Sequence, residues 1–226
     1  MNWPGIRILV TGFGPFPGVP FNASSSLVDH LAENQTRSVP RATIFSATLP
    51  TDWRHAAIEA RHLVERFDPH VILHFGVSRR CTGFEIETQA RNLASPFLDQ
   101  AGLAPIGRTV RRSAPPVLKT TVPASLLVQR LRLLGLPAVL SADAGRYLCN
   151  AVLYETLHHI RDRKPAPLVG FIHIPALPAE SGNGAFGEAA RAWRELKAGA
   201  EIIVRSMIPF AMAARRRGLG TARQIG

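Results

Sequence analysis

Short apolar runs of strand length alternate with amphipathic helical patterns along most of the sequence, and this alternation constrains the fold more than any other feature. The run Val71–Phe75 is apolar throughout, which is typical of a strand buried on both faces of a sheet. Residues 52–67 place apolar side chains at helical spacing, and Asp68-Pro69 ends that helix. Strands that alternate with helices predict one three-layer α/β/α domain.

The remaining elements are predicted from the same patterns. Strands are expected at residues 6–11, 42–49, 71–75, 84–90, 138–141 and 168–174. Helices are expected at residues 27–33, 52–67, 123–134, 150–161 and 187–217. Pro209 is expected to kink or split the last helix, because proline lacks a backbone donor. We divide the chain into a domain over residues 1–210 and a basic C-terminal tail over residues 211–226.

The chain is strongly basic, with a formal net charge of +11. Two stretches without acidic residues, one between Asp99 and Asp143 and one after Glu201, account for the whole excess. Such an excess favours nucleic acid or a membrane surface as a partner. However, the arginines are not interleaved with the aromatic residues that form stacking platforms, so we expect no nucleic-acid partner. No apolar run reaches the length of a membrane span, and no membrane partner is expected.

The cysteine and histidine content bears on the compartment and on metal binding. The N-terminal segment lacks the basic and apolar regions of a signal peptide, so we expect a cytoplasmic protein whose two cysteines are reduced. His158 and His159 have no partner at the spacing of a zinc site. We therefore predict no metal and no cofactor.

Cys149 stands where the strand predicted at residues 138–141 turns through Asp143-Ala144-Gly145 into a helix. The positive end of a helix dipole favours the thiolate, which is the nucleophilic form, and backbone N–H groups of the same turn can bind an oxyanion. His173, near the end of the next strand, can meet Cys149 as a general base and acid. These residue types suit a cysteine hydrolase, although a buried cysteine that only packs in the core is the more common case.

Other residues complete the candidate chemistry. Glu85 and Glu87 lie on one face of the strand predicted at residues 84–90, where either can orient a histidine or remain solvated. Phe13 and Phe16 follow the first strand, at the end where open α/β sheets bind ligands. From the residues alone, a binding role and a core role are equally open for these phenylalanines. Their glycine-rich loop matches neither the dinucleotide fingerprint nor the P-loop.

Four segments resemble, in order and spacing, the motifs of pyroglutamyl peptidase I, a cysteine peptidase family also called pyrrolidone-carboxylate peptidase. DAGRYLCN resembles the cysteine segment of that family, and GFIHIPALP resembles its histidine segment. VTGFGPFPG, followed by Asn22-Ala23-Ser24, resembles the N-terminal signature. ETQARN, which begins at Glu87, resembles the glutamate segment. The resemblance spans residues 6–210.

The resemblance implies a cytoplasmic cysteine exopeptidase, an omega peptidase that removes an N-terminal pyroglutamyl residue from peptides. It implies that Cys149 is the nucleophile, that His173 is the general base and acid, and that Glu87 orients the histidine. Phe13 and Phe16 would hold the lactam ring, an assignment that suits aromatic faces and a flat, uncharged ligand. The resemblance also implies a twisted mixed sheet, a homo-oligomer (a tetramer), and no metal or cofactor.

The chain departs from the family pattern at the edges of the expected pocket. The loop Ser95–Gly102 is shorter than that of the family, and Phe97 stands near the place of an arginine. Gly76-Val77-Ser78-Arg79-Arg80 stands where many members have a glycine-rich segment. Two alternatives therefore stay open. One is a related cysteine hydrolase with a different small lactam or N-acyl substrate, and the other is a non-catalytic basic binding protein on this scaffold.

Overall fold

A computed structural model describes residues 5–16, 21–35, 39, 42–177 and 185–222. Its main sheet has six strands in the order β2-β1-β3-β8-β4-β7. These strands are β1 (Ile6–Phe13), β2 (Ala42–Leu49), β3 (Val71–Ser78), β4 (Phe84–Glu87), β7 (Ala138–Ser141) and β8 (Leu168–Pro175). Strands β2, β1, β3 and β8 pair in parallel, whereas β4 runs antiparallel to β8 and parallel to β7. The sheet is therefore mixed.

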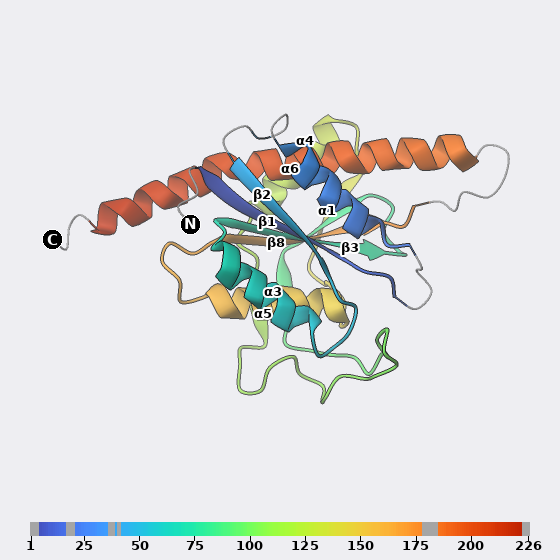
Figure 1. The fold of residues 1–226 in the computed structure, drawn as a ribbon, viewed down its shortest axis with the longest axis horizontal. Coiled ribbons are helices and arrows are strands. Elements are labelled where there is room, and N and C mark those ends of the chain that lie inside the picture. Colours follow the sequence, from blue (N-terminus) through green and yellow to red (C-terminus); the bar gives the residue numbers. More distant parts are fainter. Residues whose placement is uncertain (1–4, 17–20, 36–38, 40–41, 178–184, 223–226) are drawn as a thin grey trace.

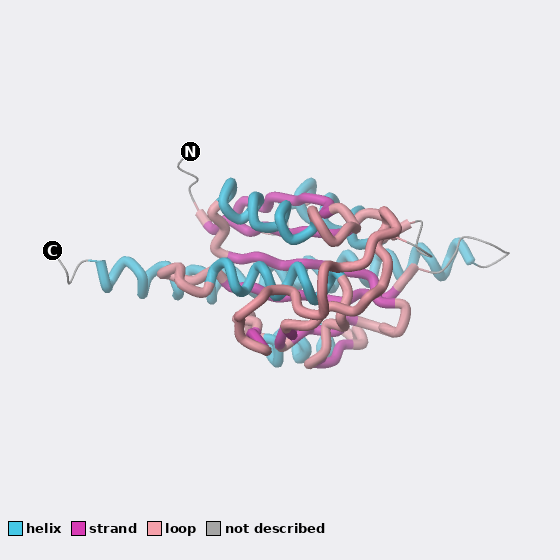
Figure 2. Tube along the Cα trace, turned by 90° about the horizontal axis from the view of Figure 1, so that it is seen from below, coloured by secondary structure: helices cyan, strands magenta, loops and turns pink. Residues whose placement is uncertain are grey.

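Helices cover both faces of this sheet (Figure 1). One face carries α1 (Ala23–Glu33), α4 (Ala124–Leu133) and α6 (Ala185–Ala222), and the other carries α3 (Ala56–Phe67) and α5 (Leu148–Ile160). The C-terminal end of α6 extends beyond the sheet in both Figure 1 and Figure 2. The predicted three-layer α/β/α sandwich is confirmed. None of the described helices is long and apolar enough to cross a membrane.

Apolar clusters on the two faces of the sheet explain why the central strands are apolar throughout. Ile72 and Phe171 pack into the cluster on the side of α3 and α5, whereas Leu73 and Ile172 pack into the cluster on the side of α1, α4 and α6. Burial of each such side chain contributes about 1.5–3 kcal/mol. Apolar packing therefore stabilises β3 and β8 on both faces of the sheet, and residues at the carboxyl ends of these strands are held in fixed positions.

The structure breaks the strand predicted at residues 84–90 after Glu87. Residues Gln89–Arg91 form β5, which pairs with β6 (Val117–Lys119) in a separate two-stranded antiparallel sheet. The last bonds to the main sheet are those of Thr88, whose N–H and hydroxyl both donate to the carbonyl oxygen of Ser141 in β7, at 2.7 and 2.8 Å. Strand β6 lies in a segment for which the sequence predicted neither a strand nor a helix.

Helix α6 is not split at Pro209 but runs through it as one helix, so of the kink or split that was expected, the split is wrong. Proline removes one backbone donor, and buried contacts on either side of it compensate for this loss. Met207 and Ala211 are both packed in the core, so the helix is held on each side of the proline. The boundary expected at residue 210 falls within this helix and stays a prediction.

Gly12, in β1, allows α1 to pack closely against the sheet. A Cβ atom at this position would lie 2.3 Å from the carbonyl oxygen of Ser24, so Gly12→Ala must displace the helix. We expect this substitution to lower the free energy of unfolding by about 1–3 kcal/mol, as measured by chemical denaturation. Gly14→Ala is the matched control, because the nearest atom to its Cβ would be 3.7 Å away. Equal stability of the two variants would contradict this role of Gly12.

Candidate active site

Cys149, His173 and Glu87, which the sequence predicted as a set, are brought together in the structure. Cys149 lies in the first turn of α5, His173 near the end of β8, and Glu87 at the end of β4. Cys149 and His173 line the same cavity, and Nδ1 of His173 lies 2.8 Å from Oε1 of Glu87. The three groups thus form a chain from thiol to imidazole to carboxylate.

The register of the sheet places the imidazole between two strands. His173 pairs with Gly76 of β3 on one side and with Glu85 of β4 on the other. Because side chains alternate along a strand, Glu87 lies on the same face as Glu85 and reaches the ring diagonally. A Cβ atom at Gly76 would lie only 3.2 Å from Sγ of Cys149, so glycine there leaves space for the thiol.

Glu87 is fully buried, and its second oxygen, Oε2, has no hydrogen-bond partner among the described residues. A buried polar group without a partner costs about 1–3 kcal/mol, and a charged group costs more. Stability therefore does not explain this carboxylate. Its hydrogen bond through Oε1 holds the proton on Nδ1 of His173 and leaves Nε2 for the thiol.

The hydrogen bonds of His173 decide its protonation. Burial, the largest single influence, lowers the pKa of this imidazole, because it disfavours the charged form. Hydrogen bonds to Cys149 and Glu87 and the negative charges of these groups together outweigh burial and raise the pKa from 6.5 to about 10. Near neutral pH, His173 is therefore an imidazolium that can pair with a thiolate and later protonate a leaving group.

Helix α5 begins beside the thiol with its first backbone donors uncapped. Tyr147, at the N-cap, makes no side-chain hydrogen bond to the first turn, and its hydroxyl instead donates to the carbonyl oxygen of Leu98 at 3.2 Å. The first N–H groups of a helix have no partner within the helix. These groups, including that of Cys149, can stabilise an oxyanion that develops next to the sulfur.

Asn150 fixes the start of this helix, a role that sequence reasoning missed. Its buried amide donates to the carbonyl oxygens of Arg91 and Leu93, at 2.8 and 2.9 Å, and accepts the N–H of Arg91 at 2.8 Å. The helix containing Cys149 is thereby tied to the segment that follows β5. An amide within the otherwise apolar stretch Leu148–Tyr154 is the signal that could have identified it.

A cavity of about 180 Å³ opens beside Cys149, and its lining is mainly apolar. Phe13 and Phe16, the predicted ring-binding residues, both belong to this lining. Phe13 is buried, with its ring centroid 6.2 Å from that of Phe171, whereas Phe16 is half-buried. The hydroxyl of Thr51, which also lines the cavity, donates to the carbonyl oxygen of Pro15 and so holds the loop that carries Phe16.

The loop Ser95–Gly102 lies against the outer side of this cavity and is fixed by Asp99. The carboxylate of Asp99 accepts the N–H groups of Trp53, Ala101 and Leu103, each at 2.9 Å. Burial would raise the pKa of Asp99, but these hydrogen bonds prevail and lower it. Sequence reasoning missed this anchor, although an Asp three residues before a Gly is a typical turn signal.

The same loop touches the cavity wall through its backbone. The indole of Trp53 donates to the carbonyl oxygen of Phe97 at 2.9 Å and meets the ring of Tyr147 edge-on at 5.3 Å. The side chain of Phe97 is 65% exposed. Gly18 and Pro178, which end two of the quoted motifs, lie outside the described residues.

Glu85, Glu87 and His173 place potential ligand atoms within 4.8 Å of one another. The three groups have the composition of a cation site. However, a cation bound there would compete with the hydrogen bond between His173 and Glu87. The geometry therefore favours acid–base chemistry over metal binding by these side chains.

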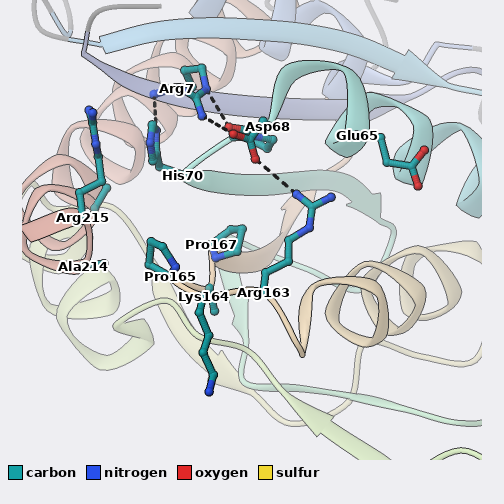
Figure 3. A pocket seen from close by; sticks show the side chains of 13 residues that line it. Arg7, Glu65, Asp68, His70, Arg163, Lys164, Pro165, Pro167, Ala214 and Arg215 are labelled. Atoms are coloured by element: carbon teal, nitrogen blue, oxygen red, sulfur yellow. Dashed lines mark hydrogen bonds and ion pairs between the residues drawn. The ribbon is translucent and has the colours of Figure 1, made fainter. Parts of the chain in front are cut away.

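A larger cavity, of about 530 Å³, lies at the amino-terminal ends of β1, β3 and β8, away from the cavity beside Cys149 (Figure 3). Asp68 contacts Arg7 at 2.7 Å and Arg163 at 3.5 Å, so these three charges are paired with one another. Burial, together with the positive charges of Arg7 and Arg215, lowers the pKa of His70 to about 4. The described lining holds no cysteine. The described lining of this cavity therefore does not supply the thiol that a cysteine hydrolase requires.

Comparison with known proteins agrees with this geometry. A family model described as pyroglutamyl peptidase matches residues 6–203. A pyrrolidone-carboxylate peptidase of Gloeobacter violaceus is 33% identical over 177 residues, which is 78% of this chain and 84% of that protein. One from Thermococcus litoralis is 29% identical over 181 residues, or 80% and 81% of the two chains. The crystal structure of pyrrolidone carboxyl peptidase from Pyrococcus furiosus has a TM-score of 0.80 at 25% identity, covering 91% of this chain and 100% of that one.

The carboxylate of Glu87 should control the protonation of His173. Glu87→Gln keeps the shape of the side chain but removes its negative charge, so we expect the pKa of His173 to fall below its value of about 10. An NMR titration of the imidazole measures this shift. Glu85→Gln is the matched control, because it removes a carboxylate from the same face of β4 while keeping the 2.8 Å hydrogen bond of Glu87. An unchanged His173 pKa in the Glu87 variant would contradict the role of this residue.

Proposed function

The chain belongs to the pyroglutamyl peptidase family, and we propose that Cys149, His173 and Glu87 are the residues with which it removes the N-terminal pyroglutamyl group from peptides. The family is one of cysteine omega peptidases. The observation that carries the proposal is the buried hydrogen bond between His173 and Glu87, with His173 and Cys149 lining the same small apolar cavity.

The first half of the reaction forms a thioester. The thiolate of Cys149 attacks the carbonyl carbon of the pyroglutamyl group, and the resulting oxyanion is received by N–H groups in the first turn of α5. The intermediate then collapses, and the C–N bond breaks. His173 donates its proton to the leaving amine, so the shortened peptide departs as the free amine and the acyl group stays on sulfur.

The second half of the reaction restores the thiolate. Neutral His173 takes a proton from a water molecule, which attacks the thioester carbon. The C–S bond breaks, pyroglutamate leaves, and the thiolate is again paired with an imidazolium. Throughout the cycle, Glu87 keeps the ring in place and stabilises its positive charge through the 2.8 Å hydrogen bond.

The cavity accounts for a preference for pyroglutamate. Its volume of about 180 Å³ is below the range of roughly 300–1,000 Å³ that is usual for ligand pockets, so a compact ring fits it best. Apart from Cys149 and His173, its described lining carries no ionisable group other than the hydroxyl of Tyr147. A charged amino-terminal residue would be desolvated there without a partner, whereas a neutral lactam would not. The faces of Phe13 and Phe16 offer a surface for that ring.

The proposal also covers the oligomeric state, the location and the domain boundary of the protein. Resemblance to the family supports a homotetramer and a cytoplasmic location for this chain. It also supports a catalytic domain over residues 1–210 that is followed by a basic tail. Sedimentation equilibrium of the purified full chain measures the number of subunits directly.

Replacement of the nucleophile should abolish the reaction. We expect Cys149→Ala to lose all hydrolysis of an uncharged pyroglutamyl amide reporter while keeping the wild-type circular dichroism spectrum. Cys81→Ala is the control. Cys81 is buried, and burial raises its pKa to about 11, so this thiol should not contribute. Reporter hydrolysis by the Cys149 variant, or its loss in a folded Cys81 variant, would refute the assignment.

Removal of one aromatic wall should weaken recognition of the ring. Phe16 is half-buried in the cavity lining, so Phe16→Ala should lower kcat/KM for the reporter by about tenfold, the effect of losing roughly 1.4 kcal/mol of apolar contact. Phe97→Ala serves as the matched control, because that ring is exposed and does not line the cavity. Steady-state kinetics measures kcat/KM for both variants. An equal fall in kcat/KM in the Phe16 and Phe97 variants would contradict the ring-binding role of Phe16.

A further inference from the structure

The loop between β3 and β4 crosses the end of β8 beside His173. Strand β8 lies between these two strands in the sheet, so a short connection from one to the other must pass over it. The loop starts after Ser78, which lines the cavity, and Sγ of Cys81 lies 3.7 Å from the carbonyl oxygen of His173. Arg79 and Arg80 therefore stand at the mouth of the cavity, on the side of the catalytic imidazole.

Arg146 reaches the same mouth from the segment before α5. Its neighbours Ala144 and Tyr147 both line the cavity. The backbone here is fixed, because the carbonyl oxygen of Arg146 accepts the N–H of Ser95 at 2.8 Å. Arg79, Arg80 and Arg146, named here the rim arginines, thus belong to the two chain segments that border the cavity.

The rim arginines outnumber the acidic groups that are free on the same two segments. All three side chains are exposed, and within the described part of the chain none of them forms an ion pair. Glu87 and Asp99 are buried and engaged by His173 and by backbone N–H groups, respectively. Half-buried Glu85 and exposed Asp143 are the remaining acidic groups on these two segments. The mouth of the cavity is therefore basic.

The chemistry sets the path of the substrate past this rim. His173 must lie next to the leaving amine in order to protonate it, so the residues after pyroglutamate leave the cavity beside the loop that carries Arg79 and Arg80. Guanidinium groups bind carboxylates through paired hydrogen bonds and repel cationic side chains. We propose that the rim arginines form a basic subsite that selects peptides with acidic residues directly after the pyroglutamyl group. This inference rests on the proposed function.

Two peptides of equal length test the preference: pyroglutamyl-Glu-Glu-Gly and pyroglutamyl-Lys-Lys-Gly. At low salt, wild type should cleave the acidic peptide with a kcat/KM at least about fivefold higher, which is the effect of one exposed ion contact in water. The ratio should approach one in about 1 M salt, where charges beyond a few ångströms are screened. Equal kcat/KM values for the two peptides at low salt would overturn the proposal.

Matched variants separate the subsite from the overall charge of the protein. The triple variant Arg79→Gln, Arg80→Gln and Arg146→Gln should lose the preference for the acidic peptide. A control triple variant makes the same change of charge at exposed arginines away from the cavity lining: Arg112→Gln, Arg194→Gln and Arg216→Gln. The control should keep the preference, and a rim variant that also keeps it would refute the subsite.

The uncharged pyroglutamyl amide reporter distinguishes failure of this inference from failure of the proposed function. Wild type and both triple variants should hydrolyse the reporter at similar rates, because the reporter has no charge for the rim to bind. Normal reporter hydrolysis without a preference between the two peptides would overturn the subsite alone. Absence of reporter hydrolysis in wild type would overturn the proposed function, and the subsite with it.

Discussion

The 2.8 Å hydrogen bond between His173 and Glu87 is the interaction on which the rest of the site depends. It crosses from β8 to β4, at the place where the sheet changes from parallel to antiparallel pairing. A shift of this register by one residue would move the carboxylate to the other face of the sheet. The orientation of the imidazole, and through it the state of the Cys149 thiol, is therefore set by how two strands pair.

This arrangement is costly for the fold and is supported by the core around it. Glu87 is fully buried with one oxygen unpaired, and His173 is an almost buried cation at neutral pH. The apolar side chains on both faces of β3 and β8 stabilise the strands that carry these groups. Asn150 ties helix α5, which carries Cys149, to Arg91 in β5 and to Leu93, so the thiol is positioned by hydrogen bonds as well as by packing.

Features with a local signature could be predicted from the sequence, and features that depend on distant partners could not. The layers follow from periodicity, as Val71–Phe75 illustrates, and the family follows from short motifs around Cys149 and His173. Strand β6 has only three residues and exists because it pairs with β5. The hydrogen bond from the N–H of Trp53 to Asp99 likewise joins residues that are 46 apart in the sequence. The uninterrupted course of α6 through Pro209 depends on core contacts on both sides of the proline.

Trapping of the acyl-enzyme tests the central claim most directly. Wild-type protein would be mixed rapidly with a pyroglutamyl peptide, quenched in acid, digested with trypsin and analysed by mass spectrometry. The account predicts that the peptide containing Cys149 gains the mass of one pyroglutamyl group, in a linkage that hydroxylamine cleaves. Release of pyroglutamate with Cys149 unmodified and the acyl group on another residue, such as Cys81, would contradict it.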